Sequence, residues 1–424
     1  MRELTDSGLV WVGEVPAHWQ MHPVYHYFGE RKHRNLQGRE DNLLSLSYGR
    51  VIRKDINSNG GLLPASFNTY NIVEPNDIII RPTDLQNDKK SLRTGLCTER
   101  GIITSAYIAL MPIKPLNSAY FHYLLHSYDV TKVFYNMGNG VRQGLNFSEF
   151  SKMMILEPPI EEQDRIVAFL DVKTAEIDQI VAEIQAQIET LEQYKQSIIT
   201  ETVTNGLDPN ADVRESGYAW VGAIPISWRM EKGKYLFVQR STKGNAISLE
   251  LLSPTQKFGV IPQTLYEELT GMNAVKLDEK TDLALMKTIH KGDYCISLRS
   301  FQGGFEYSEY EGVVSPAYQV FYPTVEIADG YYKYLFKEKG FIEKMNSYTM
   351  TLRDGKNIAF ADFGNTYIPY PPVEEQREIA EFLDAKVAEI DAVIAQKKEQ
   401  LAVIDSYRRS LIYEYVTGKK EVEV

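Results

Sequence analysis

The sequence predicts an α+β protein with two mixed α/β domains joined by two long antiparallel helices that pair as a coiled coil. Two repeated motifs predict this architecture. Residues 7–19 and 216–228 share the pattern Ser-Gly-x-x-Trp-Val-Gly-x-[Val/Ile]-Pro-x-x-Trp. A second pattern, Pro-Pro-[Ile/Val]-Glu-Glu-Gln, begins at Pro158 and again at Pro371, and each copy leads into heptad-spaced apolar residues. The 424 residues therefore hold a domain followed by a helix twice, with pseudo-twofold symmetry.

The globular part of each repeat contains short strands and short helices. Residues 77–81 and 293–297 are short apolar runs that follow turn residues, which is typical of strands. Residues 120–128 and 331–339 have the spacing of short helices. The two copies cannot be aligned over residues 54–72 and 254–270. We interpret the shared segments as scaffold and the remainder as interchangeable loops.

Each Pro-Pro motif predicts the start of a long helix. Proline fits the first helical turn, where no amide donor is lost, and the glutamates that follow lie beside the positive end of the helix dipole. Asn205-Gly206 and Gly418 predict the helix ends, because glycine favours the left-handed cap. The residues that we expect to pair the helices are Ile177, Ile180, Ile184, Gln187, Leu191, Tyr194, Ile198, Ile390, Val393, Gln400, Ile404, Tyr407 and Leu411.

Polar residues fall within this predicted seam at Gln187, Lys397 and Gln400. In a seam they would fix the register of the helices at a cost in stability, and the alternative is that they are exposed. The short link between the first helix and the second domain favours antiparallel pairing. We predict a first domain at 1–157, a first helix at 158–205, a linker and second domain at 206–370, a second helix at 371–418 and a tail at 419–424.

Composition limits the class of protein. The net charge of −11 gives no support to a nucleic-acid partner, although the acidic residues concentrate in the two helical segments. The two cysteines, Cys97 and Cys295, fall at non-equivalent places in the repeats, so a shared disulfide is not expected. There is no signal-peptide pattern and no apolar run of membrane-spanning length, and we expect a cytoplasmic protein.

The repeated motifs resemble the specificity (S) subunit of type I restriction–modification enzymes. The resemblance covers the whole chain and rests on the Trp-Val-Gly-x-[Val/Ile]-Pro-x-x-Trp motif and on Pro-Pro-[Ile/Val]-Glu-Glu-Gln-x-x-Ile-[Val/Ala]-x-Phe-Leu-Asp, each present twice. It implies two target-recognition domains that each read one half of a split, asymmetric sequence in double-stranded DNA. The helices would set the gap and dock two methyltransferase (M) subunits, and endonuclease–translocase (R) subunits would complete the complex.

The resemblance also implies a chain that has no catalytic or metal site and no cofactor of its own, with S-adenosylmethionine, ATP and Mg²⁺ bound by the partner subunits. The sequence agrees, because it has no phosphate-binding Gly-x-x-x-x-Gly-Lys-[Ser/Thr] loop and no Gly-x-Gly-x-x-Gly fingerprint after a strand. The alternative function is a coiled-coil assembly scaffold whose globular domains bind proteins. A self-contained nuclease would need an acidic metal cluster, which the sequence does not suggest.

Candidate DNA contacts are basic or amide side chains in predicted loops. Arginine suits a phosphate or a guanine edge, and Asn or Gln suits an adenine edge. The alternatives are a structural arginine–carboxylate pair in a turn and, for the basic runs, plain solvation. The candidates are Arg81, Lys89, Lys90, Arg93, Arg142, Gln143, Asn146, Arg299, Arg353, Lys356 and Asn357.

Overall fold

The structure is a computed structural model that describes residues 3–57, 64, 66–85, 92–137, 144–244, 249–272, 283–296, 304–348 and 358–422. It divides into two compact units. The first comprises Met1–Ile184 together with Lys398–Val424, and the second comprises Gln185–Lys397. Each unit therefore contains one globular domain and about half of each long helix, and the predicted fold class is confirmed.

The long helices are α3 (Ile160–Asn205) and α9 (Val373–Val416). Both begin directly after the Pro-Pro pairs and carry two glutamates in the first turn. Gly206 (φ 78°) and Gly418 (φ 70°) follow the ends in the left-handed conformation that the sequence predicts. A Cβ at Gly418 would overlap the ring of Pro16, so glycine is needed there for close packing as well as for its backbone conformation.

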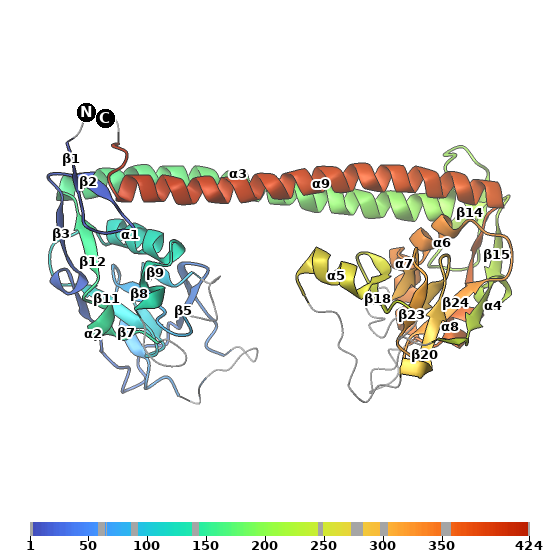
Figure 1. The fold of residues 1–424 in the computed structure, drawn as a ribbon, viewed down its shortest axis with the longest axis horizontal. Helices are drawn as coiled ribbons and strands as arrows, with labels where there is room; N and C mark the ends of the chain where they lie inside the picture. The colour runs from blue at the N-terminus through green and yellow to red at the C-terminus, as the bar shows by residue number, and fades with distance from the viewer. Residues whose placement is uncertain are drawn as a thin grey trace. The chain divides into compact units, whose positions relative to one another are not determined.

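The globular part of the first unit is built around a four-stranded antiparallel sheet in the order β4-β11-β8-β9. Figure 1 shows strands β8, β9 and β11 of this sheet close together. In its register Leu110 of β11 lies opposite Ile78 of β8, and β8 is buried along its whole length. The elements are β1 (Leu4–Asp6), β2 (Glu14–Pro16), β3 (Gln20–Pro23), η1 (Val24–His26), β4 (Phe28–Glu30), β5 (Leu44–Ser47), β6 (Arg50–Arg53), β7 (Asn71–Val73), β8 (Ile78–Ile80), β9 (Thr94–Leu96), β10 (Gly101–Ile103), β11 (Ile108–Pro112), α1 (Ser118–Val130), η2 (Val133–Asn136), α2 (Phe147–Phe150) and β12 (Met154–Glu157).

The second unit repeats the sheet in the order β16-β24-β21-β22, with Phe321 of β24 opposite Tyr294 of β21. The elements are β13 (Val213–Glu215), β14 (Ala223–Pro225), β15 (Arg229–Lys232), α4 (Gly233–Leu236), β16 (Phe237–Arg240), β17 (Lys243–Gly244), β18 (Leu252–Thr255), β19 (Gly259–Pro262), α5 (Gln263–Thr270), η3 (Leu283–Leu285), β20 (Met286–Ile289), β21 (Tyr294–Ile296), β22 (Phe305–Tyr307), β23 (Gly312–Val314), β24 (Gln319–Pro323), α6 (Asp329–Leu335), α7 (Lys339–Ser347), α8 (Phe360–Asn365) and β25 (Tyr367–Tyr370).

The smaller strand pairings also repeat. The hairpin β5–β6 corresponds to β18–β19, the pair β7–β10 to β20–β23, and the pair β3–β12 to β15–β25. Each hairpin is joined to the neighbouring strand by an isolated parallel bridge, Leu43 to Ile102 in one unit and Leu251 to Val313 in the other. The copies therefore share a framework that extends into segments where their sequences differ.

A buried ion pair links two strands of the four-stranded sheet in each unit. It lies between the end of β4 and the start of β8 in the first unit, and between the end of β16 and the start of β21 in the second. Arg31 holds Asp77 through Nε–Oδ2 at 2.5 Å and Nη2–Oδ1 at 3.0 Å. Arg240 holds Asp293 through the same atoms at 2.7 and 3.0 Å. Burial still raises the pKa of Asp77, even though its paired guanidinium acts in the opposite direction. These carboxylates depend on their arginine partners, because an unpaired buried charge is strongly destabilising.

The predicted helix at 331–339 is shorter in the structure. Helix α6 ends at Leu335, and Glu338 has extended backbone (ψ 139°) and caps α7 by accepting a hydrogen bond from the Phe341 amide at 2.7 Å. The carboxylate supplies a local backbone partner that competes with a continuous helix. In the first unit α1 runs unbroken from Ser118 to Val130, beyond the predicted end at residue 128.

Candidate functional site

A buried glutamine fastens each long helix to its globular domain. The side chain of Gln163 donates to the Pro158 carbonyl at 2.8 Å and accepts from the Asn117 amide at 3.0 Å. Gln376 repeats the arrangement with the Pro371 carbonyl at 2.8 Å and the Ala328 amide at 2.9 Å. This is the physical role of the Gln in the Pro-Pro-x-Glu-Glu-Gln motif, and it fixes the direction in which each helix leaves its domain.

A buried tyrosine contacts the end of the other long helix in each unit. Tyr120 of α1 donates to the Val416 carbonyl of α9 at 2.9 Å, and Tyr331 of α6 donates to the Val203 carbonyl of α3 at 2.8 Å. Such carbonyls in the last helical turn have no partner within their own helix. The Trp19 ring packs edge-on against Tyr120, and Trp228 packs in the same way against Tyr331. Trp19 and Trp228 are therefore packing anchors at the helix ends.

The two long helices pair antiparallel within each unit. In the first unit the ring of Phe169 lies 4.4 Å from that of Tyr415, and Arg408 forms an ion pair with Asp178 at 2.5 Å. In the second unit Lys195 pairs with Asp391 at 2.6 Å, and Lys397 donates to Gln187 at 2.5 Å. Residue numbers rise along α3 as those of their partners fall along α9, so the pairing is antiparallel in both units.

One of the two predicted seam rows is wrong by one residue. Ile177, Ile390 and Leu411 are buried in the structure, as a seam requires. However, Ile180, Tyr194, Val393, Gln400 and Tyr407 are exposed. Gln187 is exposed too, but it does pair the helices as predicted, because it accepts the hydrogen bond from Lys397. The inward-facing residues lie one position later, at Val181, Ile188, Lys195, Ile394, Leu401 and Arg408. The predicted and the observed second rows both have heptad spacing. The observed row lies four residues after the first row, whereas the predicted row lies three residues after it.

The exposed residues form a matched pair of rows, which we call the outer rows. The outer row of α3 is Ile180, Gln187 and Tyr194, and that of α9 is Val393, Gln400 and Tyr407. Each has an aliphatic residue, a glutamine and a tyrosine at steps of seven. In the first unit Asp178 faces Arg50 of the globular domain, and Ile180 lies two residues later, about 200° around the helix. Ile180 therefore lies on a side of the helix that faces away from Arg50.

The structure corrects one predicted DNA contact. Arg93 is fully buried, and its guanidinium donates to the carbonyls of Thr83 (2.5 Å) and Asp84 (2.9 Å) and to the Tyr135 hydroxyl (2.9 Å). Its own amide donates to Asp129 at 2.5 Å. Arg93 therefore holds a turn together and is not available to DNA.

Two other candidates lie within the described residues. Asn146 is exposed but caps α2, accepting from the Glu149 amide at 3.0 Å while Glu149 accepts from the Asn146 amide. Arg81 follows β8 and is half-buried. The remaining candidates lie outside the described residues and stay predictions: Lys89, Lys90, Arg142, Gln143, Arg299, Arg353, Lys356 and Asn357.

Sequence reasoning missed the hairpin β5–β6. Its inner face places Leu44, Leu46 and Val51 against the domain, whereas the outer face carries Ser45, Ser47, Arg50 and Ile52. Tyr48 and Gly49 form the two-residue turn, with φ of 46° and 79°. Positive φ at both turn residues identifies a type I′ turn, which favours Asn-Gly and in which tyrosine is strained. The Tyr48 side chain is nevertheless 91% exposed.

The hairpin β18–β19 occupies the corresponding place in the second unit. Its three-residue loop exposes Gln256 and Lys257, and the Lys257 ammonium lies 4.9 Å from the ring of Phe258. Gly259 follows with φ of 71°. Both tips thus combine an aromatic residue, a left-handed glycine and a basic residue. A signal was present in the sequence, because Leu-Leu-Ser begins both hairpins and aromatic-Gly followed by Val-Ile ends them, with Arg50 inserted in the first.

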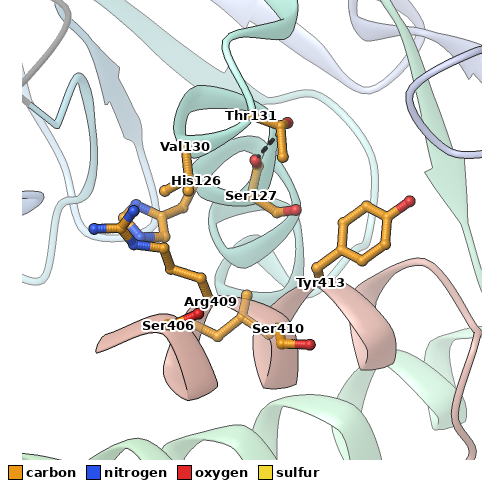
Figure 2. A pocket seen from close by; sticks show the side chains of 9 residues that line it. His126, Ser127, Val130, Thr131, Ser406, Arg409, Ser410 and Tyr413 are labelled. Carbon is orange, nitrogen blue, oxygen red and sulfur yellow. Dashed lines mark hydrogen bonds between the residues drawn. The ribbon is translucent and has the colours of Figure 1, made fainter. Parts of the chain in front are cut away.

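A pocket of about 270 Å³ lies between α1 and α9 in the first unit (Figure 2). Its walls are His126, Ser127, Val130, Thr131, Ser406, Arg409, Ser410, Ile412 and Tyr413. Burial lowers the pKa of His126 to about 4, so its imidazole is neutral at neutral pH. The lining has a single imidazole and neither a carboxylate nor a thiol, which does not fit a metal site.

Over the described parts of the chain, no cluster of three or more His, Cys, Asp or Glu side chains could hold a metal ion. Within the same ranges, no helix is both long and apolar enough to cross a membrane. The buried Cys97 has its pKa raised to about 11 by desolvation, so this thiol stays protonated and unreactive at neutral pH.

Each unit contains a globular domain that is built on the same framework and is fixed to both long helices. This repeated architecture defines the class of protein. The chain belongs to the family described as Type I restriction modification DNA specificity domain, which it matches over residues 99–190 and 229–403. It is a specificity subunit of the type I restriction–modification class, with a function in DNA recognition.

Similar proteins carry the same description. The type I restriction enzyme MjaVIII specificity subunit of Methanocaldococcus jannaschii is 24% identical over 371 residues, covering 83% of this chain and 81% of the relative. The provisionally named MjaX specificity subunit of the same organism is 24% identical over 316 residues, covering 72% and 68%. A solved structure from work on complex assembly and conformational transition of the type I R-M system has a TM-score of 0.66 at 15% identity, covering 96% of this chain and 99% of that one.

Proposed function

We propose that this chain directs a type I complex to a bipartite, asymmetric DNA sequence, each globular domain reading one half. The observation that carries the proposal is the repetition of one framework around different exposed tips. The same sheet order, ion pair and helix joints occur in both units. By contrast, Tyr48 and Arg50 form one hairpin tip, and Gln256 and Lys257 form part of the other. Unlike tips on equal scaffolds favour two different half-sites over a palindrome.

In this proposal the long helices set the gap between the half-sites. A continuous helix of 46 residues, such as α3, extends for about 69 Å at ~1.5 Å per residue. That is enough to hold two readers one to two duplex turns apart, at ~34–36 Å per turn. The glutamine joints support a fixed geometry, because they remove freedom where each helix leaves its domain.

We assign the outer rows to the docking of two methyltransferase subunits. Each row exposes apolar side chains at heptad spacing that the internal seam does not use, and Ile180 and Tyr194 are 46% and 49% exposed. Exposed apolar heptad rows are suited to helix packing with a partner. Two matching rows suit two copies of one partner. S-adenosylmethionine, ATP and Mg²⁺ are assigned to the methyltransferase and endonuclease–translocase subunits.

Methylation mapping tests this function. DNA from cells that carry the chain with its methyltransferase should show one modified motif, made of two unlike half-sites and an unread gap. A palindromic or uninterrupted motif would overturn the bipartite reading. A chain that leaves methylation unchanged, and whose complex does not bind duplexes in titrations, would instead favour the protein-binding scaffold.

A further inference from the structure

The two hairpin tips have the features of a reading element, although Arg50 of the first tip also forms an exposed ion pair with Asp178. At each tip the base is packed and the end is exposed: Leu44 and Leu252 are buried, whereas Tyr48 and Lys257 are exposed. Gly101 and Gly312 allow this packing, since a Cβ at either would overlap the carbonyl of Asn42 or Glu250 at the hairpin base. A fixed base with a projecting end presents side chains without the entropy cost of a mobile loop.

Tyr48 argues most strongly for function at the tip. A left-handed backbone is disfavoured for a non-glycine residue, and this tyrosine recovers little by packing, because its side chain is 91% exposed. Asparagine at the same position would make the favoured Asn-Gly type I′ turn. A strained and exposed aromatic residue is best explained by a contact made outside the chain.

We propose that the tips Ser47–Arg50 and Gln256–Gly259 enter the major groove of DNA and read base edges, the first tip at one half-site and the second at the other. This inference rests on the proposed function. A two-stranded ribbon fits the major groove, which is about 12 Å wide. Arg50 can grip a guanine edge, the aromatic ring can contact a thymine methyl group, and Gln256 can address adenine.

The charged groups around the first tip allow Arg50 to exchange its contact with Asp178 for a contact with DNA. Arg50 pairs with Asp178 of α3 at 2.7 Å, and its side chain is 70% exposed. Asp178 also pairs with Arg408 at 2.5 Å, so two guanidiniums share one carboxylate and the cluster has a net positive charge. Exposed ion pairs contribute little to stability, because water screens the two charges. Arg50 can therefore leave Asp178 to contact DNA, while Asp178 stays paired with Arg408.

Selection from a randomised duplex library tests the assignment, with the purified full chain in complex with its methyltransferase subunits. Arg50→Ala should remove a base preference in one half-site only and lower affinity for the preferred duplex by about 5- to 150-fold. Lys257→Ala should affect only the other half-site. Tyr25→Ala and Lys339→Ala, which remove exposed side chains elsewhere in the same units, should leave the selected motif unchanged.

Tyr48→Asn separates function from folding. The substitution relieves the turn, so the Tm of the complex should be unchanged or higher by about 2–4 °C, while the preference at the first half-site is lost. If the wild-type complex selects no split motif, the proposed function fails. If it selects one and the tip variants select the same motif, with equal affinity or with a uniform loss across sequences, only the hairpin assignment is overturned.

Discussion

Replacing Gln376 by alanine should loosen the joint between the second domain and α9. The side chain is completely buried and makes two hydrogen bonds at once, to the Pro371 carbonyl at 2.8 Å and from the Ala328 amide at 2.9 Å. Alanine leaves both backbone groups without this partner in a site that water does not reach. The first turn of α9 then loses its attachment to the loop that precedes α6.

The size of the effect follows from these two bonds. A buried polar group left unsatisfied costs about 1–3 kcal/mol, so two such groups cost about 2–6 kcal/mol. Gln376→Glu gives a sharper control. Its carboxylate can still accept from Ala328 but cannot donate to Pro371, whereas the protonated acid can do both. The glutamate variant should therefore regain stability as the pH falls, and the alanine variant should not.

Urea unfolding followed by tryptophan fluorescence measures each unit separately, because each holds two of the four tryptophans. Trp11→Phe with Trp19→Phe leaves Trp220 and Trp228 as reporters of the second unit. Gln376→Ala should lower the stability of that unit, and Gln163→Ala should do the same in the first. A loss no larger than that of the exposed Gln396→Ala would refute the joint.

Three further outcomes are expected. Arg31→Ala should lower the stability of the first unit by about 3–5 kcal/mol, because it leaves the buried Asp77 carboxylate without its partner. Arg240→Ala should have the same effect on the second unit. Urea unfolding measures both losses, and values below about 1 kcal/mol would contradict a stabilising role for the ion pairs. In the same assay Ile188→Ala should lower the stability by about 2–5 kcal/mol, and Ile180→Ala by under about 1 kcal/mol. The main effect of Ile180→Ala should be weaker methyltransferase binding in a pull-down. Equal losses of stability in the two variants would contradict the corrected seam. Burial raises the pKa of Glu306 to about 7, above its unfolded value of about 4.3, so the native state retains a proton that the unfolded chain has lost. Stability should fall as the pH rises between these values, by roughly 4 kcal/mol in all. Glu306→Gln should abolish that slope, and an unchanged pH profile would argue against it.

The sequence contained the framework because repetition within one chain marks the residues that both copies need. The Pro-Pro pairs, Gln163 and Gln376, and the final glycines are all placed by contacts that occur twice. Their function as joints could not be deduced, since the atoms that the glutamines bond come from the distant residues Asn117 and Ala328.

The seam error has a geometric origin. A heptad pattern predicts that two rows face inward, but residues three and four positions after the first row both recur every seven. Ile180 and Tyr194 are apolar enough to suit either assignment, and only the packing of the second helix selects Ile188 and Lys195 instead. The apolar character of the rejected row is then itself informative, because it marks an exposed surface.

The DNA contacts were the least predictable part of the site. Arg93 follows a basic run, which suggested a DNA contact or a solvated side chain. Its guanidinium is instead held inside by the carbonyls of Thr83 and Asp84 and by the hydroxyl of Tyr135. The shared Leu-Leu-Ser and aromatic-Gly pattern of the hairpins is hidden by differences in length. The second copy has two more residues between its Leu-Leu-Ser and its aromatic residue, and the first copy has Arg50 as an extra residue after its glycine.

The most direct test of the central claim varies the gap between two fixed half-sites. Once methylation mapping has given the motif, binding of the complex is measured on duplexes that differ only in the number or identity of the intervening base pairs. Two readers held by stiff helices predict tight binding at one gap length, a steep loss when one base pair is added or removed, and indifference to gap sequence. Affinity that stays constant as the gap lengthens would contradict the account.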